Sequence, residues 1–304
     1  MKFLSMCWFC CAAVVAQPLA RHSQPVSQWR MNSRNYLQAG DARSFAVSGR
    51  TGDADELLCK VGSVISAGLP GRLPRKELFE AHAVATLVNR HFPSEQSILE
   101  PCAGCGLLAV FLVLLNRLRH VRCSDKKRPR IARELAQCVE KEWPFLAHQI
   151  RWEEADLRKT TLKVAPNELL VACHACSFLS DEMILAAKEN RRPLVLVPCC
   201  YETEPNLPDR PWLPNWSWKR WPWLQEGAAN RLGRSAIHSA RMNVLQDAGY
   251  HVVQDEIGRQ ITDMNGVIVA WPRARNMVPK RLALYLLCLL LVLHDLCTTS
   301  LVLL

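Results

Sequence analysis

The feature of this sequence that most constrains its fold is an alternation of short apolar runs with longer helical stretches from residue 97 onward. The apolar runs predict strands over Ser97–Glu100, His120–Ser124, Ile150–Ala155, Leu169–Ala175, Leu194–Cys199, Val252–Ile257 and Val267–Trp271. Helical stretches cover Leu107–Leu118, Pro129–Glu142, Ser180–Glu189 and Ala228–Ala248. Alternating strands and helices favour a mostly parallel sheet with helices on both faces. The sequence therefore predicts an α/β fold with seven strands.

The two ends of this alternating region differ from its middle. No helical stretch separates the last two strands, so we expect them to form a terminal antiparallel hairpin at one side of the sheet. Before the first strand, Leu57–Ile65 and Lys76–Phe92 have the spacing of helices, and the second helix is expected to stop before Pro93. With 304 residues and 49% hydrophobic composition, the chain can build an ordinary globular core.

The stretch Ser97–Leu108 is typical of a nucleotide-like cofactor site. A short strand ending in Glu100 leads into a turn with Gly104 and Gly106, and an apolar helix follows. Glycines let the backbone approach a ligand closely, and the first amides of the helix can donate to a carboxylate or phosphate. A glycine turn of this kind is also common for purely structural reasons. Other residues of the chain are needed to distinguish a cofactor site from a structural turn.

Two further acids follow strands that end at the same edge of the sheet. Asp125 ends the second strand, at the place where an acid can bind the two hydroxyl groups of a ribose, and Asp156 follows the third. Each acid alone is better explained as a solvated loop residue. Together with Glu100 they place carboxylates at three successive strand tips, which favours a ligand site.

These residues resemble the class I S-adenosylmethionine-dependent methyltransferases, with Glu100-x-Cys102-x-Gly104-x-Gly106 followed by Asp125 and Asp156. The resemblance covers about Leu57 to Pro272. A more specific likeness is to a methyltransferase-like branch related to the enzymes that 2′-O-methylate the tRNA acceptor stem. That likeness rests on Cys173-His174-Ala175-Cys176 with Ser180-Asp181, on Pro198-Cys199-Cys200-Tyr201, and on Ile261-Thr262-Asp263-Met264-Asn265.

The resemblance implies a Rossmann-like fold and S-adenosylmethionine as the cofactor. The residues implied to bind the cofactor are Glu100, Cys102, Gly104, Gly106, Asp125, Asp156 and His174. The family usually has glycine where this chain has Cys102, so the turn has to form without the most permissive residue. No Asn-Pro-Pro-Tyr sequence follows the fourth strand, which argues against methylation of an adenine amino group.

Residues at the tips of the fourth and fifth strands would face the transferred methyl group. His174 is the candidate base, with a bonded structural imidazole as the alternative, and Asp181 would either orient it or cap the next helix. Cys199 or Cys200 could act as a nucleophile toward a pyrimidine carbon, and Tyr201 lies beside them. Zinc held by these cysteines with His174 and Cys176 is another alternative, although the close paired spacing of zinc modules is missing. The simpler explanation is that the cysteines are small residues packed beside the cofactor, and we predict no metal.

The chain is basic, with a formal net charge of +10, which favours an anionic partner such as RNA. The excess is concentrated between positions 117 and 133, in Arg117, Arg119, Arg122, Lys126, Lys127, Arg128, Arg130 and Arg133. A solvated helix face explains this pattern as well as an RNA-binding patch does. An insertion at 205–224 holds five of the ten tryptophans, interleaved with basic residues. It is expected to be a lid, a base-stacking surface or a membrane contact.

Both ends of the chain are predicted to lie outside the catalytic domain. The short apolar run in 1–20 is typical of a signal peptide, and acid-poor 21–40 of a transit peptide. Together they favour a plastid reached through the secretory route, with secretion or a mitochondrion as alternatives. The apolar tail 282–304 is a possible membrane contact, although His294 and Asp295 interrupt it. The predicted division is 1–20 leader, 21–55 transit-like segment and linker, 56–93 N-terminal helices, 94–272 methyltransferase domain and 273–304 tail.

Overall fold

The structure, a computed structural model, describes residues 36–37, 53–157, 159–176, 178–198, 226–262 and 265–274. Side chains are described for these residues except 53–55 and 226–232. The leader 1–20, almost all of 21–55, the tryptophan-rich insertion 205–224 and the tail 282–304 therefore lie outside the described residues. Among the residues that are described, no helix is long and apolar enough to cross a membrane.

One sheet of seven strands forms the centre of the described chain, in the order β3-β2-β1-β4-β5-β7-β6. The strands are β1 (Ser97–Pro101), β2 (His120–Asp125), β3 (Ile150–Glu154), β4 (Glu168–Cys173), β5 (Leu194–Val197), β6 (Tyr250–Glu256) and β7 (Gly266–Pro272). The first five strands pair in parallel, whereas β7 is antiparallel to both β5 and β6. The predicted α/β class, parallel sheet and terminal hairpin are confirmed.

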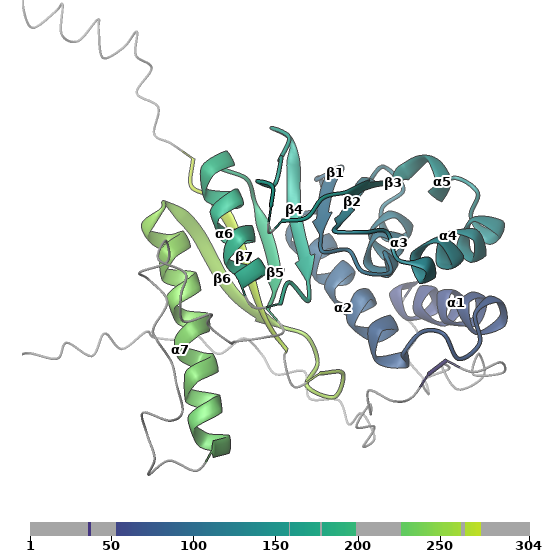
Figure 1. Ribbon diagram of the computed structural model, residues 1–304, viewed down its shortest axis with the longest axis horizontal. Helices are drawn as coiled ribbons and strands as arrows, with labels where there is room; N and C mark the ends of the chain where they lie inside the picture. Colours follow the sequence, from purple (N-terminus) through teal and green to yellow (C-terminus); the bar gives the residue numbers. More distant parts are fainter. Residues whose placement is uncertain are drawn as a thin grey trace, which may run out of the picture. The chain divides into compact units, whose positions relative to one another are not determined.

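Helices cover both faces of this sheet (Figure 1). They are α1 (Asp53–Gly68), α2 (Arg75–His91), α3 (Leu107–Leu115), α4 (Arg130–Glu142), α5 (Leu146–Gln149), α6 (Phe178–Asn190) and α7 (Glu226–Asp247). Alternate residues of each buried strand point to opposite faces. Ile98 and Val171 pack in the cluster that contains α1 to α4, while Leu99 and Leu170 pack in the cluster that contains α6 and α7.

The two helices before β1 belong to the same core as the sheet. Leu58 and Ile65 of α1 and Val84 of α2 are buried in one cluster with Ile98 of β1 and Phe111 of α3. Every predicted strand and helix is present, with ends that differ by at most a few residues. The short α5 was not predicted, because four residues are too few to show a helical period.

The topology fixes where a ligand can bind. The chain leaves β1 toward β2 on one side and later returns to β4 on the other side of β1. In open parallel sheets, a crevice forms at the carboxyl ends of two strands whose connections leave in opposite directions. The tips of β1 and β4, with β2 beside them, are therefore the place to look for a site.

Candidate cofactor site

The turn between β1 and α3 adopts left-handed backbone at three positions. Cys102, Gly104 and Gly106 have φ angles of 58°, 55° and 78°. The amide of Ala103 donates to the carbonyl of Ser124 at 3.2 Å, which ties the turn to the end of β2. Left-handed backbone costs a non-glycine residue about 1 kcal/mol or more. Cys102 therefore holds a strained conformation at the position where the resembling family has glycine.

The two glycines of this turn are needed for different reasons. A Cβ atom at Gly106 would lie 2.7 Å from Cζ2 of Trp152, a side chain of β3 that packs under the turn. A Cβ atom at Gly104 would meet no heavy atom within 4 Å. Gly106 is thus required by packing inside the protein, whereas Gly104 leaves open space above the turn for a ligand.

Asp125 lies beside this open space, at the end of β2. Its Oδ2 accepts a hydrogen bond from the amide of Gly104 at 2.9 Å, and its Oδ1 accepts one from the amide of Lys126 at 2.7 Å. Each carboxylate oxygen has a second lone pair that can accept from a hydroxyl group. Asp156 follows β3, and its Oδ2 lies 3.5 Å from Nζ of Lys126, so the structure brings both predicted acids to the same corner.

Glu100 has a different position from the one that the sequence suggested. Its side chain is 3% exposed and lies inside the protein, where the thiol of Cys123 donates to Oε2 at 3.6 Å. Burial raises the pKa of Glu100 to about 8, although hydrogen bonds from Cys123 and from the amide of Ala109 act in the opposite direction. The carboxyl group accepts a hydrogen bond from the amide of Ala109 in the first turn of α3. The expectation that Glu100 faces the ligand is therefore wrong.

Helix α2 contributes charged side chains that the sequence analysis did not assign to the site. Oε2 of Glu80 lies 2.7 Å from Nε2 of His174, and Oε1 of Glu80 lies 2.8 Å from Nζ of Lys76. The Glu80 side chain is 1% exposed, while that of His174 is 37% exposed. One signal was visible in the sequence, since Glu80 falls on the face of α2 that is otherwise apolar.

This pairing decides the charge of His174, which also has a left-handed φ of 63°. Hydrogen bonds with Cys173 and Glu80 raise the pKa of His174 to about 10, against the opposing effect of burial. Burial would raise the pKa of Glu80, but the hydrogen bonds and charges of His174 and Lys76 lower it overall. At neutral pH the imidazole holds its proton, so the predicted role as general base does not fit this arrangement.

A second carboxylate of α2, that of Glu77, lies close to the same turn. The Sγ atom of Cys105 is 3.9 Å from Oε2 of Glu77. Burial raises the pKa of Glu77, and the charge of Glu80 adds to this effect, whereas the charge of His174 opposes it. Burial also raises the pKa of Cys102 and Cys105 to about 12, so both thiols of the turn stay protonated.

Asp181 does not orient His174. Its side chain is buried, and its Oδ1 accepts from Nε of Arg241 at 2.8 Å, which joins α6 to α7. The predicted acceptor-side residues Cys199, Cys200 and Tyr201 lie outside the described residues. Within the part of the chain that is described, no group of three or more His, Cys, Asp or Glu side chains could hold a metal ion. Cys176, which follows β4, is disulfide-bonded.

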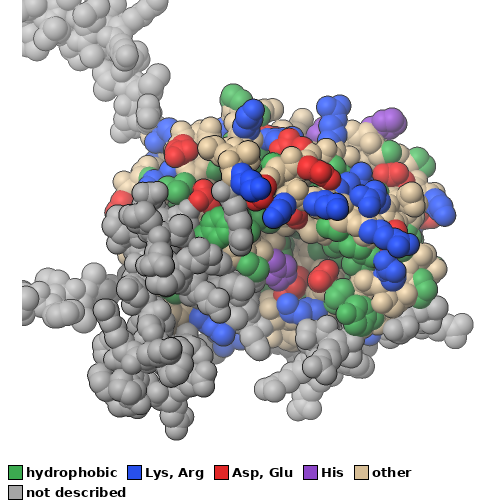
Figure 2. Space-filling view, in the orientation of Figure 1, with side chains coloured by type: hydrophobic (Ala, Val, Ile, Leu, Met, Phe, Trp, Pro, Cys, Tyr) green, Lys and Arg blue, Asp and Glu red, His purple; other side chains and the backbone are tan. Residues whose placement is uncertain are grey.

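The basic stretch 117–133 divides into two groups. Arg119 is fully buried and donates to the carbonyl groups of Glu95, Leu112 and Phe92, and Arg122 pairs with Glu168. Arg117 is exposed before β2. The other five lie around the β2–α4 connection, where Arg128 is half-buried and the exposed ones are Lys126, Lys127, Arg130 and Arg133. Figure 2 shows Lys and Arg side chains gathered over the side of the molecule where Figure 1 labels β3, α4 and α5.

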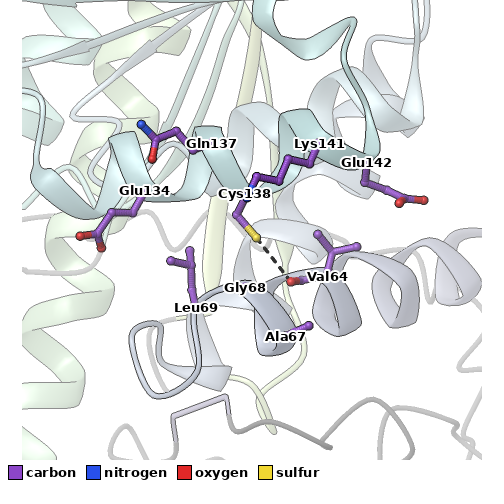
Figure 3. Close-up of a pocket in the computed structure, with 9 residues that line it drawn as sticks. All are labelled: Val64, Ala67, Gly68, Leu69, Glu134, Gln137, Cys138, Lys141 and Glu142. Carbon is purple, nitrogen blue, oxygen red and sulfur yellow. Dashed lines mark hydrogen bonds between the residues drawn. The ribbon is translucent and has the colours of Figure 1, made fainter.

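The described chain also has a groove away from the strand tips. It has a volume of about 480 Å³ and lies between α1 and α4, where Val64 and Gly68 face Cys138 and Lys141 (Figure 3). The Cys138 thiol points across the groove and donates to the carbonyl of Val64 at 3.4 Å. None of the side chains predicted to bind the cofactor lines this groove, so it is separate from the candidate site.

Comparison with known proteins agrees with this geometry. Residues 79–203 match a family model described as a methyltransferase domain. Over these residues the chain is similar to a methyltransferase domain. The match begins within α2 and extends past β5. No curated protein matches the chain.

Solved structures with a similar fold are distant in sequence. An O-methyltransferase family protein from Burkholderia thailandensis is 14% identical, with 80% of this chain and 66% of that chain covered and a TM-score of 0.40. Human N-acetylserotonin methyltransferase in complex with SAM is 12% identical, with 78% and 63% covered and a TM-score of 0.36. A protein from Corynebacterium glutamicum is 13% identical, with 75% and 94% covered and a TM-score of 0.44. The chain thus spans less than two thirds of the length of the first two.

The residues at the strand tips fit S-adenosylmethionine, the cofactor that the resemblance implies. The open space at Gly104 admits a ligand to the backbone, and Asp125 presents oxygens beside it. The cofactor carries an ammonium and a sulfonium group, and the carboxyl groups of Asp125 and Asp156 lie at the same crevice. When bound, S-adenosylmethionine supplies an electrophilic methyl group for an in-line displacement.

Proposed function

We propose that this protein is an S-adenosylmethionine-dependent methyltransferase of RNA, with tRNA or rRNA as the substrate class. The observation that carries the proposal is the exposed basic group at the β2–α4 connection, directly after Asp125 in the chain. Lys127 and Arg133 are exposed there, next to the acid that would hold the ribose of the cofactor. Cationic side chains beside a methyl donor favour an anionic polymer as the acceptor, because they track its phosphates.

The side chains of the domain would have different roles in this reaction. Asp125 and Asp156 would bind the ribose end of the cofactor, and Gly104 would let the cofactor lie against the turn. His174 keeps its proton at Nε2 through Glu80, so it would present a positive charge to an RNA phosphate rather than accept a proton. A base for the acceptor group would then come from elsewhere. Cys199 or Cys200 remains the predicted nucleophile toward a pyrimidine carbon, with Tyr201 beside them.

Two other functions are tested by the same experiment. The first is methylation of a small molecule or a protein. The second is a fold that has lost catalysis and serves as an RNA- or membrane-binding module. The strained Cys102 favours the second alternative, because a non-glycine residue at this position makes the cofactor turn costly to form.

The test combines cofactor binding with methyl transfer. We would titrate the full chain with S-adenosylmethionine in a calorimeter and then incubate it with radiolabelled cofactor and organellar RNA. The double variant Lys127→Gln/Arg133→Gln should bind RNA about tenfold more weakly, with a salt dependence reduced by about two phosphate contacts. Arg259→Gln, which changes an exposed arginine near β6, is the matched control.

Each outcome separates the functions. RNA methylation that falls in the double variant and persists in the control supports the proposal. Methylation of a small molecule or protein that does not respond to salt overturns the choice of RNA. RNA or vesicle binding without any heat of cofactor binding supports the inactive module.

We also propose delivery to an organelle, with the plastid favoured over the secretory pathway or a mitochondrion, on the composition of residues 1–55. A fluorescent fusion of the full chain should colocalise with plastids, and a fusion that begins at residue 56 should stay in the cytosol. A possible membrane contact through 282–304 predicts that the full chain pellets with vesicles and that a chain ending at 272 does not. Equal distribution of the long and short forms would refute these proposals.

A further inference from the structure

A second cavity lies at the amino ends of the parallel strands, opposite the cofactor crevice. It has a volume of about 400 Å³ and is lined by residues from the end of α2, the approach to β1, the α6–β5 turn and the end of β7. These residues are His91, Phe92, Glu95, Arg191, Arg192, Pro193, Trp271 and Pro272. Cavities of this size commonly hold a small organic ligand. The six residues of β4 place about 20 Å between the two ends of the sheet.

The wall of this cavity combines aromatic rings with guanidinium groups. The ring of Trp271 packs edge-to-face with Phe92 at 6.2 Å and is stacked with His251 at 5.7 Å, so its position is fixed. Nε of Arg192 donates to the carbonyl of Glu168 at 2.8 Å, which fixes the second guanidinium at the wall. Aromatic faces beside arginines are the combination that binds a nucleobase together with its phosphate.

Arg191 carries the strongest indication of a binding role. It directly follows α6 with a left-handed φ of 49°, a position that helices commonly fill with glycine. An arginine there costs stability that glycine would not cost. Strain of this kind is retained where the side chain has a use. Arg191 lines the cavity, and its Nη2 donates to the carbonyl of Arg273 at 3.4 Å.

The charged side chains around the cavity favour an anionic ligand. Arg90 and His91 are both within hydrogen-bond distance of Asp255, so that acid is already paired. Arg191 and Arg192 therefore outweigh the single carboxylate of Glu95 in the lining. A carboxylate at the wall can accept hydrogen bonds from the amino groups of a purine.

We infer that this cavity binds a nucleoside monophosphate unit, with the base against Trp271 and the phosphate at Arg191 and Arg192. The unit would be either a free nucleotide or an unpaired nucleotide of an RNA. The inference does not depend on the proposed methylation of RNA, because the cavity is at the opposite edge of the sheet from the cofactor crevice.

The experiment uses a variant that removes the guanidinium without harming the fold. Arg191→Gly should leave the melting temperature unchanged or raise it, because glycine suits the left-handed backbone. We would measure binding of guanosine and adenosine monophosphate by calorimetry, and binding of a short unpaired oligoribonucleotide by fluorescence anisotropy. The variant should weaken binding at least about tenfold, since a charge-assisted contact to phosphate is lost.

The measurements also distinguish the two sources. Weaker binding of the monophosphates assigns the cavity to a free nucleotide, and weaker binding of the oligoribonucleotide alone assigns it to RNA. Equal affinity of Arg191→Gly and the unchanged protein, or no binding of any probe at millimolar concentration, overturns the inference. S-adenosylmethionine binding is measured in the same samples and should be equal in both proteins, so a failure of the cofactor site is recognised separately.

Discussion

At the carboxyl ends of the parallel strands, the carboxylate of Asp125 bonds backbone amides, whereas at the amino ends the guanidinium of Arg119 bonds backbone carbonyls. Asp125 accepts from the amides of Gly104 and Lys126 at the first edge. Arg119 donates to the carbonyls of Glu95 and Phe92 at the second edge. The difference follows from chain direction, because helices between parallel strands begin at one edge and end at the other. Their unpaired amides therefore lie at the first edge and their unpaired carbonyls at the second.

This comparison shows how one sheet can offer two chemically different edges. The acidic edge suits a cofactor that carries ammonium and sulfonium groups, and the arginine edge suits an anion. It also separates structural charges from functional ones. A charge that only satisfies backbone groups should affect stability, and a charge or glycine that faces open space should affect binding.

The largest effect is expected at the arginine edge, from Arg119→Met. Arg119 is fully buried, and its guanidinium donates to three backbone carbonyl groups. Removing the guanidinium takes away three hydrogen bonds in a buried place, which should lower the free energy of unfolding by about 3–5 kcal/mol. Urea denaturation would measure the loss. Arg117→Met, two residues earlier at an exposed position over the ring of Phe145, is the control and should cost less than about 1 kcal/mol. Similar losses in both variants would contradict this account.

At the acidic edge, Glu80→Gln should remove the charge that holds the proton on His174. The pKa of His174 is then expected to fall from about 10 toward its ordinary value of 6.5, which a histidine NMR titration can follow. The raised pKa means that the pair stabilises the fold fully below pH 6.5, and that this contribution is lost as the pH rises toward 10. At neutral pH, Glu80→Gln should cost about 2 kcal/mol, because His174 is partly exposed.

The control for this prediction is Glu77→Gln, which changes the neighbouring carboxylate of α2. It should leave most of the shift on His174, since Glu80 makes the direct contact at 2.7 Å. An unshifted His174 in the unchanged protein would show that the imidazole is not held by Glu80.

Gly104→Ala should separate binding from stability within the cofactor turn. The added methyl group meets no protein atom, so it should cost about 1 kcal/mol of stability through its φ of 55° alone. The same methyl group would occupy the space left for the cofactor, and affinity for S-adenosylmethionine should fall at least about tenfold. Calorimetric titration and thermal melting measure the two effects.

Gly249→Ala is the matched control, because Gly249 has a φ of 80° and equally open surroundings but lies between α7 and β6. It should lose similar stability and bind the cofactor normally. If Gly104→Ala also binds normally, the space above Gly104 is not part of the cofactor site.

The smallest effect is expected from Cys102→Gly. Glycine adopts the φ of 58° without strain, so this variant should gain about 1 kcal/mol of stability. Cys138→Gly, which places glycine inside α4, is expected to lose stability. Thermal melting of both variants would test whether the strain at Cys102 is real. A loss of stability in Cys102→Gly would mean that packing of the thiol outweighs the backbone cost.

The fold could be predicted almost completely from the sequence, because strand and helix periods are local properties. The side-chain roles could be predicted less well. Asp125 and Asp156 lie at the expected edge, since their positions depend only on where a strand ends. Glu100 points inward because β1 pairs with β2 in a register that sets it opposite Cys123. Asp181 is paired with Arg241, sixty positions away in the chain, and a local sequence pattern cannot predict such a contact. The pairing of Glu80 with His174 could not be predicted for the same reason.

The position of β7 has a consequence for the order in which the chain can fold during synthesis. β7 lies between β5 and β6, although it is made after both. Until residues 266–272 have left the ribosome, β5 has an unpaired edge and β6 has no neighbour in the sheet. We therefore expect β6 to stay unpaired with the sheet until the last strand inserts between it and β5. An arrest peptide placed before residue 266 should leave the nascent chain open to protease, and one placed well after 272 should not.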